Sequence, residues 1–183
     1  MRIVGRALSA YLASSRAIGP NTSMVIVCKG RDDDGTAPPR TMQWYNNSFW
    51  TLLRGLRVFD TKPWPRDIPT DTDSSKWTFC FDGVPLFPVA LTPLHEKRRS
   101  RWAPNFVIAL QPKWVLDLLL GTPEKRRQAT TKVRTLLEKY DDVGISPDLT
   151  TYGEEGTTEK NQLFLLDDND DPHGQCPFVD IEG

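Results

Sequence analysis

The residues best suited to chemistry lie in 92-TPLHEKRRSRW-102, where one histidine precedes a cluster of arginines. A neutral imidazole can bind a metal ion or act as a general base near neutral pH. Arg98, Arg99 and Arg101 would lower the pKa of His95 and favour that neutral form. The same guanidinium groups suit an anion, because arginine forms paired hydrogen bonds with carboxylates and phosphates. The segment therefore predicts a site for a metal-bearing anion, a phosphate compound or a carboxylate substrate. The alternative is a surface histidine in a solvated basic loop.

The second histidine and the cysteines are weaker candidates. His173 lies in the acidic, turn-rich 170-DDPHGQ-175, where a solvated role is expected. Cys176 begins a Cys-Pro dipeptide, which can present a thiolate to haem iron. Cys28 and Cys80 fall in apolar segments, where a small buried side chain is the usual role. The sequence contains no HExxH, GxSxG, Walker A or GxGxxG motif, so zinc protease, hydrolase and nucleotide-binding interpretations lack support.

Composition favours one folded domain, residues 1–183. The hydrophobic fraction of 38% is sufficient for a core, and the length suits one domain. Net charge is −1 with the basic residues spread over several segments, so a nucleic-acid partner is not expected. Three scattered cysteines do not form a disulfide framework, which favours a reducing setting inside the cell.

The sequence contains no apolar run that approaches the roughly 20 residues needed to cross a bilayer. No membrane association is expected, and a cytoplasmic location is favoured. Residues 1–31 are rich in arginine and serine and have no acidic residue, which is also the composition of a mitochondrial transit peptide. The alternative is an ordinary first helix with one buried face made by Ile3, Val4, Ala7, Leu8, Tyr11 and Leu12.

Hydrophobic periodicity predicts the elements that must position the His95 segment. Helical spacing is found at 41–59, 112–120 and 123–140, and strand patterns are found at 23–29, 77–82, 84–91 and 105–111. Gly83 provides the turn or bulge between two of the strands, and Pro85 and Pro88 favour an edge position or an irregular rim for the second. Residues 60–76 predict a long irregular connection. The fold class is therefore α+β: a single domain with a mostly antiparallel sheet covered by helices.

The order of these segments resembles the YqcI/YcgG family. The resemblance covers roughly residues 40 to 178. It is carried by 77-WTFCFDGVPLF-87, 92-TPLHEKRRSR-101, 106-FVIALQP-112, Tyr152-Gly153-Glu154 and 176-CPF-178. Residues 1–40 depart from the family pattern, since members typically carry Phe-Pro-Cys or Tyr-Pro-Cys ahead of the first strand and Cys28 follows no proline. Members with an assigned function look like haem-dependent N-oxygenases that hydroxylate a guanidine nitrogen of arginine or related amino acids.

The resemblance implies haem b as cofactor and His95 as the axial ligand of its iron. Arg98, Arg99 and Arg101 would hold the haem propionates or a substrate carboxylate. An apolar wall of the haem pocket would be formed by Trp77, Phe79, Phe81 and Phe87.

The implied substrate is a guanidine- or amine-bearing small molecule, and the implied partner is an external electron donor or peroxide. Acidic groups for the guanidinium could come from Asp67, Asp71, Asp73, Glu154 or Glu155. Two alternatives stay open: a haem carrier or sensor without turnover, and the family fold without haem.

Overall fold

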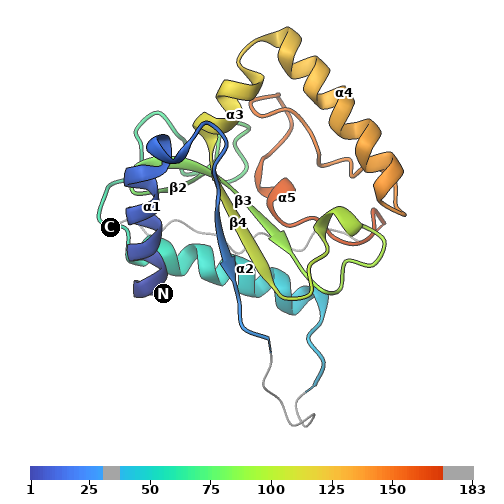
Figure 1. Cartoon of the computed structure of the whole chain (residues 1–183), viewed down its shortest axis with the longest axis horizontal. Coiled ribbons are helices and arrows are strands. Elements are labelled where there is room, and N and C mark those ends of the chain that lie inside the picture. Colours follow the sequence, from blue (N-terminus) through green and yellow to red (C-terminus); the bar gives the residue numbers. More distant parts are fainter. Residues whose placement is uncertain (31–37, 171–183) are drawn as a thin grey trace.

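The computed structural model describes residues 1–30 and 38–170 and has the predicted α+β fold (Figure 1). Its helices are α1 (Arg2–Ile18), α2 (Met42–Val58), α3 (Lys113–Leu120), α4 (Pro123–Tyr140) and α5 (Lys160–Leu163), with a short 3₁₀ helix η1 (Arg99–Arg101). Its strands are β1 (Met24–Val27), β2 (Phe79–Phe81), β3 (Val84–Leu91) and β4 (Val107–Pro112).

Within the described residues the strands form one antiparallel sheet in the order β1-β4-β3-β2. The two-residue turn Asp82-Gly83 joins β2 to β3, and both residues have positive φ, 56° and 72°. Asp-Gly is a favoured sequence for such a turn, because glycine has no Cβ to oppose the left-handed conformation. Gly83 therefore fixes the hairpin that leads into the His95 segment.

The edge position predicted for β3 is wrong, since β3 lies between β4 and β2. Its prolines are tolerated because their missing N–H groups face unpaired sides. Pro85 lies beyond Leu86, where pairing with β4 begins, and Pro88 lies beyond the three residues that pair with β2. The short overlap of β2 with β3 thus gives each proline the local environment of an edge.

The core lies where α1 and α2 pack against one face of the sheet, as Figure 1 shows. Leu8 of α1, Phe49 and Leu53 of α2 and Leu110 of β4 are fully buried there. The buried face predicted for the first helix is wrong at Ile3, which is 84% exposed, and at Ala7, which is also exposed, because the helix turns its Leu8 side to the core.

The prediction of a buried strand at 23–29 is also corrected. Strand β1 is the sheet edge and exposes Val25 and Val27, while Met24 and Ile26 pack on the core. The β-branched run is therefore half-buried, because only one face of this strand is covered.

Helix α4 stands apart from the sheet and is joined to it through α3, with α5 facing it (Figure 1). Its start matches the sequence prediction: Thr122 caps it by accepting a hydrogen bond from the Lys125 N–H at 3.2 Å, and Pro123 is its first residue. No residue of α4 is fully buried, so this helix does not form part of a core. It forms one wall of the space between α4 and α5.

Residues 60–76 are irregular, as predicted. One contact that fixes this connection is the hydrogen bond that Trp64 Nε1 donates to the Ile68 carbonyl at 2.8 Å. Among the described residues, none of the helices combines the length and apolar character that a bilayer crossing requires.

Candidate functional site

His95 lies completely buried between β3 and η1 and uses both ring nitrogens. Its Nε2 lies 2.9 Å from the Leu165 carbonyl, and its Nδ1 lies 2.9 Å from Thr92 Oγ1. A carbonyl only accepts, so Nε2 carries the proton, and the Thr92 hydroxyl donates to Nδ1. Thr92 Oγ1 also accepts the Leu94 N–H at 3.2 Å, which shapes the turn that holds the ring. His95 therefore connects this turn to a segment 70 residues away.

Burial lowers the pKa of His95 from its ordinary 6.5, and nearby Arg101 and Arg98 act in the same direction. The hydrogen bond to Leu165 and the charge of Asp167 oppose the shift without reversing it. The imidazole is neutral at pH 7, as the sequence predicts, but neither nitrogen has a lone pair that is unused. In this arrangement His95 does not fit an axial ligand of haem iron. Its role as a ligand stays a prediction and would require a break in one of the two hydrogen bonds.

The side chains of Arg98 and Arg99 form hydrogen bonds with other residues of the chain. Arg98 is 2% exposed, and it donates from Nε to the Leu166 carbonyl at 2.6 Å and from Nη2 to Asn169 Oδ1 at 2.7 Å. Arg99 donates from Nε and Nη2 to the Tyr140 carbonyl at 2.8 and 2.5 Å. Both arginines thus fasten the η1 region to later parts of the chain.

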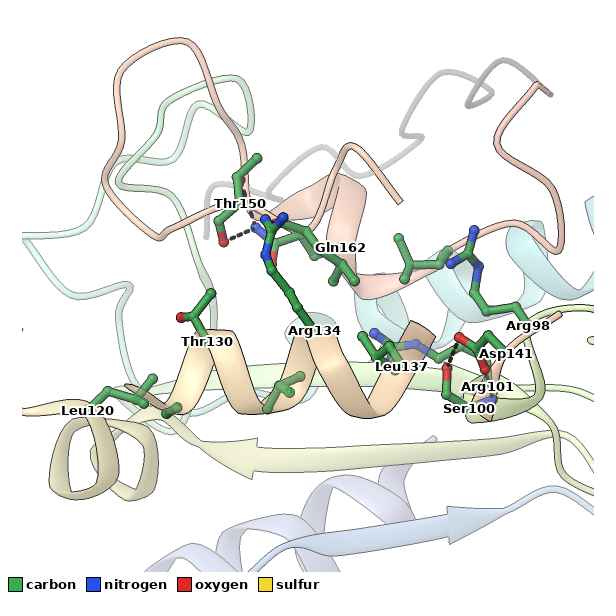
Figure 2. Close-up of a pocket in the computed structure, with 14 residues that line it drawn as sticks. Arg98, Ser100, Arg101, Leu120, Thr130, Arg134, Leu137, Asp141, Thr150 and Gln162 are labelled. Atoms are coloured by element: carbon green, nitrogen blue, oxygen red, sulfur yellow. Dashed lines mark hydrogen bonds between the residues drawn. The ribbon is translucent and has the colours of Figure 1, made fainter. Parts of the chain in front are cut away.

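Arg101 is different, since no described residue accepts a hydrogen bond from its guanidinium. It lines a cavity of about 350 Å³ between α4, η1 and α5. Figure 2 shows Arg98, Ser100, Arg101 and Asp141 at one end of this cavity, with Thr130 and Leu120 toward the other.

A second cavity, of about 210 Å³, adjoins the first and shares six lining residues with it. The shared residues are Leu120, Thr130, Arg134, Leu149, Thr150 and Gln162. We call the two cavities together the α4–α5 cleft. Gln162 Nε2 donates to Thr150 Oγ1 at 3.1 Å, and Arg134 Nη2 donates to the Leu149 carbonyl at 2.9 Å. These contacts hold α4 and α5 on either side of the cleft.

The far end of the α4–α5 cleft contains a buried ion pair. Glu159 is 4% exposed and accepts hydrogen bonds from the Thr78 hydroxyl and, at 2.5 Å, from Lys113 Nζ. Burial raises the pKa of Glu159 and lowers the pKa of Lys113, although each charge opposes the shift of the other. Lys113 Nζ also lies 3.1 Å from the ring centre of Tyr152, whose pKa burial raises to about 12. The pair places a carboxylate and an ammonium group at this end of the cleft.

The predicted aromatic wall lies mostly elsewhere. Trp77, Phe79 and Phe81 are exposed by 1% or less and belong to the main core, whereas Phe87 lines the cleft. Phe87 is partly buried and also packs against that core, so it lies between the core and the cleft.

The acidic groups proposed from sequence do not line the cleft. Asp73 pairs with Lys160, and Glu154 and Glu155 are exposed. The carboxylates in the cleft belong to Asp117, Asp141 and Glu159. Sequence reasoning missed Glu159, because its partner Thr78 is 81 residues away and no local pattern distinguishes a buried carboxylate from a solvated one. These positions leave five cationic and three acidic side chains around the cleft.

The other candidates from sequence contribute little to this site. Cys80 is buried, which raises its thiol pKa to about 12, and burial also raises the pKa of the half-buried Cys28. His173 and Cys176 lie outside the described residues. Among residues 1–30 and 38–170, no three His, Cys, Asp or Glu side chains gather closely enough to hold a metal ion.

The chain is a member of the YqcI/YcgG family, whose model matches residues 1–179. This confirms the resemblance found in the sequence. The departure of residues 1–40 from the family pattern stays a prediction, although the match includes them.

Two relatives come from Bacillus subtilis (strain 168), where both are named only as uncharacterized proteins. YcgG is 40% identical over 171 residues, covering 93% of this chain and 66% of the relative, and YqcI is 36% identical over 175 residues, covering 96% and 68%. A Streptomyces lavendulae protein named "Putative N(omega)-hydroxy-L-arginine synthase DcsA" is 29% identical over 184 residues, covering 98% of this chain and 68% of that protein. The chain thus spans about two-thirds of the length of these relatives. No solved structure matches it.

Proposed function

We propose that this chain carries the substrate site of an N-hydroxylating enzyme that acts on a small guanidine- or amine-bearing molecule, and that the α4–α5 cleft binds this substrate. The observation that carries the proposal is the similarity, over 98% of this chain, to the relative named "Putative N(omega)-hydroxy-L-arginine synthase DcsA". The name of this relative supports a small-molecule substrate, and the cleft offers a space in which such a molecule would bind.

The dimensions and lining of the cleft support this assignment. Its larger cavity, about 350 Å³, lies within the range of roughly 300–1,000 Å³ found for small-molecule sites. Leu120, Val133 and Leu137 supply apolar walls, while Gln162 and Thr150 supply amide and hydroxyl groups. Such a mixture holds the methylene chain of an amino acid and orients its polar ends.

In this proposal a cofactor, and not a side chain of the cleft, activates the oxygen. Haem b, supplied with electrons or peroxide from outside, is part of the proposal because of the family resemblance, and such a group would supply oxygen activation when bound. We assign it no ligand among the described residues, since both nitrogens of His95 are used. The residues of the cleft are therefore proposed to bind and orient the substrate and to exclude water.

The proposal predicts that the purified chain, reconstituted with haemin and given L-arginine and an oxidant, forms a product heavier by one oxygen in repeated turnovers. Thr130→Trp, at the centre of the cleft, should lower product formation at least about tenfold by filling the substrate space. Its matched control is Thr131→Trp, because Thr131 is the next residue of α4 and is exposed without lining the cleft. Mass spectrometry of the product and absorption spectra of the haem measure both.

Two results would contradict this function. Stoichiometric haem binding without product from any guanidine or amine would favour the carrier or sensor alternative. Neither haem binding nor product would favour the family fold without haem. Equal loss in Thr130→Trp and Thr131→Trp would remove the cleft from the proposal while leaving the activity in place.

A further inference from the structure

The three arginines of the η1 region differ in what their side chains do. Arg98 binds the Leu166 carbonyl and Asn169, and Arg99 binds the Tyr140 carbonyl. No hydrogen bond or ion pair joins the guanidinium of Arg101 to a described residue. One guanidinium of the cluster is therefore available to a ligand.

The nearby carboxylate of Asp141 does not neutralise Arg101 by direct contact. Its Oδ1 accepts the Ser100 N–H at 2.7 Å, and its Oδ2 accepts the Ser100 hydroxyl at 2.8 Å. Figure 2 shows this Ser100–Asp141 pair beside Arg101 at the end of the cleft. Asp141 is thus occupied in holding η1 against the end of α4.

The surroundings of Arg101 make an unpaired charge costly. Loss of water around the guanidinium, with a smaller effect of the neighbouring Arg98, lowers the pKa of Arg101 to about 10. A group held in its charged form in such a place gains most from an anion that replaces the lost water. The excess of two positive charges around the α4–α5 cleft acts in the same direction.

We propose that Arg101 binds the anionic group, a carboxylate or a phosphate, of the ligand in the α4–α5 cleft and so selects ligands that carry one. Where that ligand is the substrate, the inference rests on the proposed function and narrows its substrate class to guanidino or amino acids with a free carboxylate. A compound with only a cationic group would meet the positive excess of the cleft without compensation, so it should bind weakly.

Calorimetric titration with three probes tests this inference: L-arginine, agmatine, which lacks the carboxylate, and inorganic phosphate. L-Arginine should bind the whole chain about 10- to 100-fold more tightly than agmatine, because a charged hydrogen-bonded pair contributes about that much. Arg101→Gln should remove the difference, and Arg101→Lys should restore part of it, since lysine keeps the charge but not the paired donors. Arg127→Gln is the matched control, because Arg127 is exposed on α4 and pairs with Glu124 outside the cleft.

The outcomes separate this inference from the proposed function. Equal binding of L-arginine and agmatine by the native chain, or an unchanged preference in Arg101→Gln that circular dichroism shows to be folded, overturns the role of Arg101 and leaves the function standing. Phosphate binding that depends on Arg101, without binding of either guanidino compound, supports the anion site and contradicts the proposed substrate. Absence of binding by all three probes overturns the anion site, and a failure of Arg101→Gln to fold moves the comparison to Arg101→Lys.

Discussion

At the scale of single residues, His95 shows how a histidine beside arginines can serve the fold. The ring is neutral and buried. It donates a hydrogen bond to the Leu165 carbonyl and accepts one from the Thr92 hydroxyl. Both properties that suggested a metal ligand, neutrality and a cationic neighbourhood, are equally properties of a histidine that holds two chain segments together.

The pKa of His95 predicts a loss of stability in acid. The unfolded chain binds a proton with the ordinary pKa of 6.5, whereas the folded chain resists protonation. The unfolded state therefore binds more protons below about pH 6.5, and the free energy of unfolding falls as pH falls through that window. His95→Gln should lose this part of the pH dependence, and loss of one buried hydrogen bond should destabilise it by about 1–3 kcal/mol at neutral pH. Denaturant unfolding between about pH 5 and about pH 8 measures both effects.

His173→Gln is the matched control for this prediction, because it removes the second of the two histidines in the sequence. It should keep the pH dependence of the native chain. A His95→Gln variant whose stability varied with pH like that of the native chain would contradict the role assigned to His95.

The arginine cluster marks the limit of prediction at this scale. Its composition indicated an anion site, and Arg101 lines a cleft, but the sequence could not separate Arg101 from Arg98 and Arg99. Their acceptors, the carbonyls of Leu166 and Tyr140, lie 68 and 41 residues away. Backbone carbonyls are present at every position, so no sequence pattern marks these two.

At the scale of elements, the start of α3 is tied to the start of α5 by one ion pair. Lys113 is the first residue of α3, and Glu159 precedes α5 and also accepts from Thr78 just before β2. The pair is largely buried, so each charge depends on the other to offset its lost hydration.

Removal of either charge alone should be strongly destabilising. Lys113→Met and Glu159→Gln should each lower the free energy of unfolding by about 3 kcal/mol, because each leaves a buried polar group without its partner. The double variant should lose clearly less than the sum, which a double-mutant cycle by denaturant unfolding measures. The exposed pair Arg127–Glu124 on α4 provides the comparison, with an expected coupling below about 1 kcal/mol. Additive losses at Lys113 and Glu159 would mean that the two charges act independently.

The positions of most helices and strands in the sequence were predictable, whereas the elements that pack beside each of them were not. The spacing of apolar residues in α2 and the Thr-Pro start of α4 are local signals. Helix α4 has the predicted bounds, and α2 is one residue shorter than predicted at each end. Strand order depends on pairing between distant segments, so β1 was wrongly expected to be buried and β3 was wrongly expected to lie at an edge. Each of these two errors concerned what covers a strand, whereas the short helix α5 was not predicted at all.

At the scale of the whole molecule, stability is distributed unevenly. Helix α2 buries seven of its residues, while α4 buries none and depends on caps and on contacts such as Arg134 to Leu149. Local opening requires the least free energy where few side chains are buried. Helix α4, which borders the proposed ligand site, is therefore more easily displaced than α2.

Hydrogen exchange should reveal this difference. Backbone amides in the middle of α4 should exchange at least about tenfold faster than those in the middle of α2, because α4 can open without exposing a core. Saturation with L-arginine should slow exchange in α4 and leave α2 unchanged, if the cleft binds it. Mass spectrometry of peptic peptides measures both rates, and protection of α4 equal to that of α2 would contradict the prediction.

The contacts of the η1 region also determine when the site can form during synthesis. His95 and Arg98 donate hydrogen bonds to the carbonyls of Leu165 and Leu166. The Asp167 carboxylate accepts hydrogen bonds from the backbone N–H groups of Lys97 and Arg98. A nascent chain that has emerged from the ribosome only as far as α4 contains strands β1 to β4. It still lacks Leu165, Leu166 and Asp167, which bind the η1 region. These contacts join residues about 70 positions apart, and closing such a long segment is slow compared with local helix formation. The anion site proposed at Arg101 is thus complete only after residue 169 has emerged.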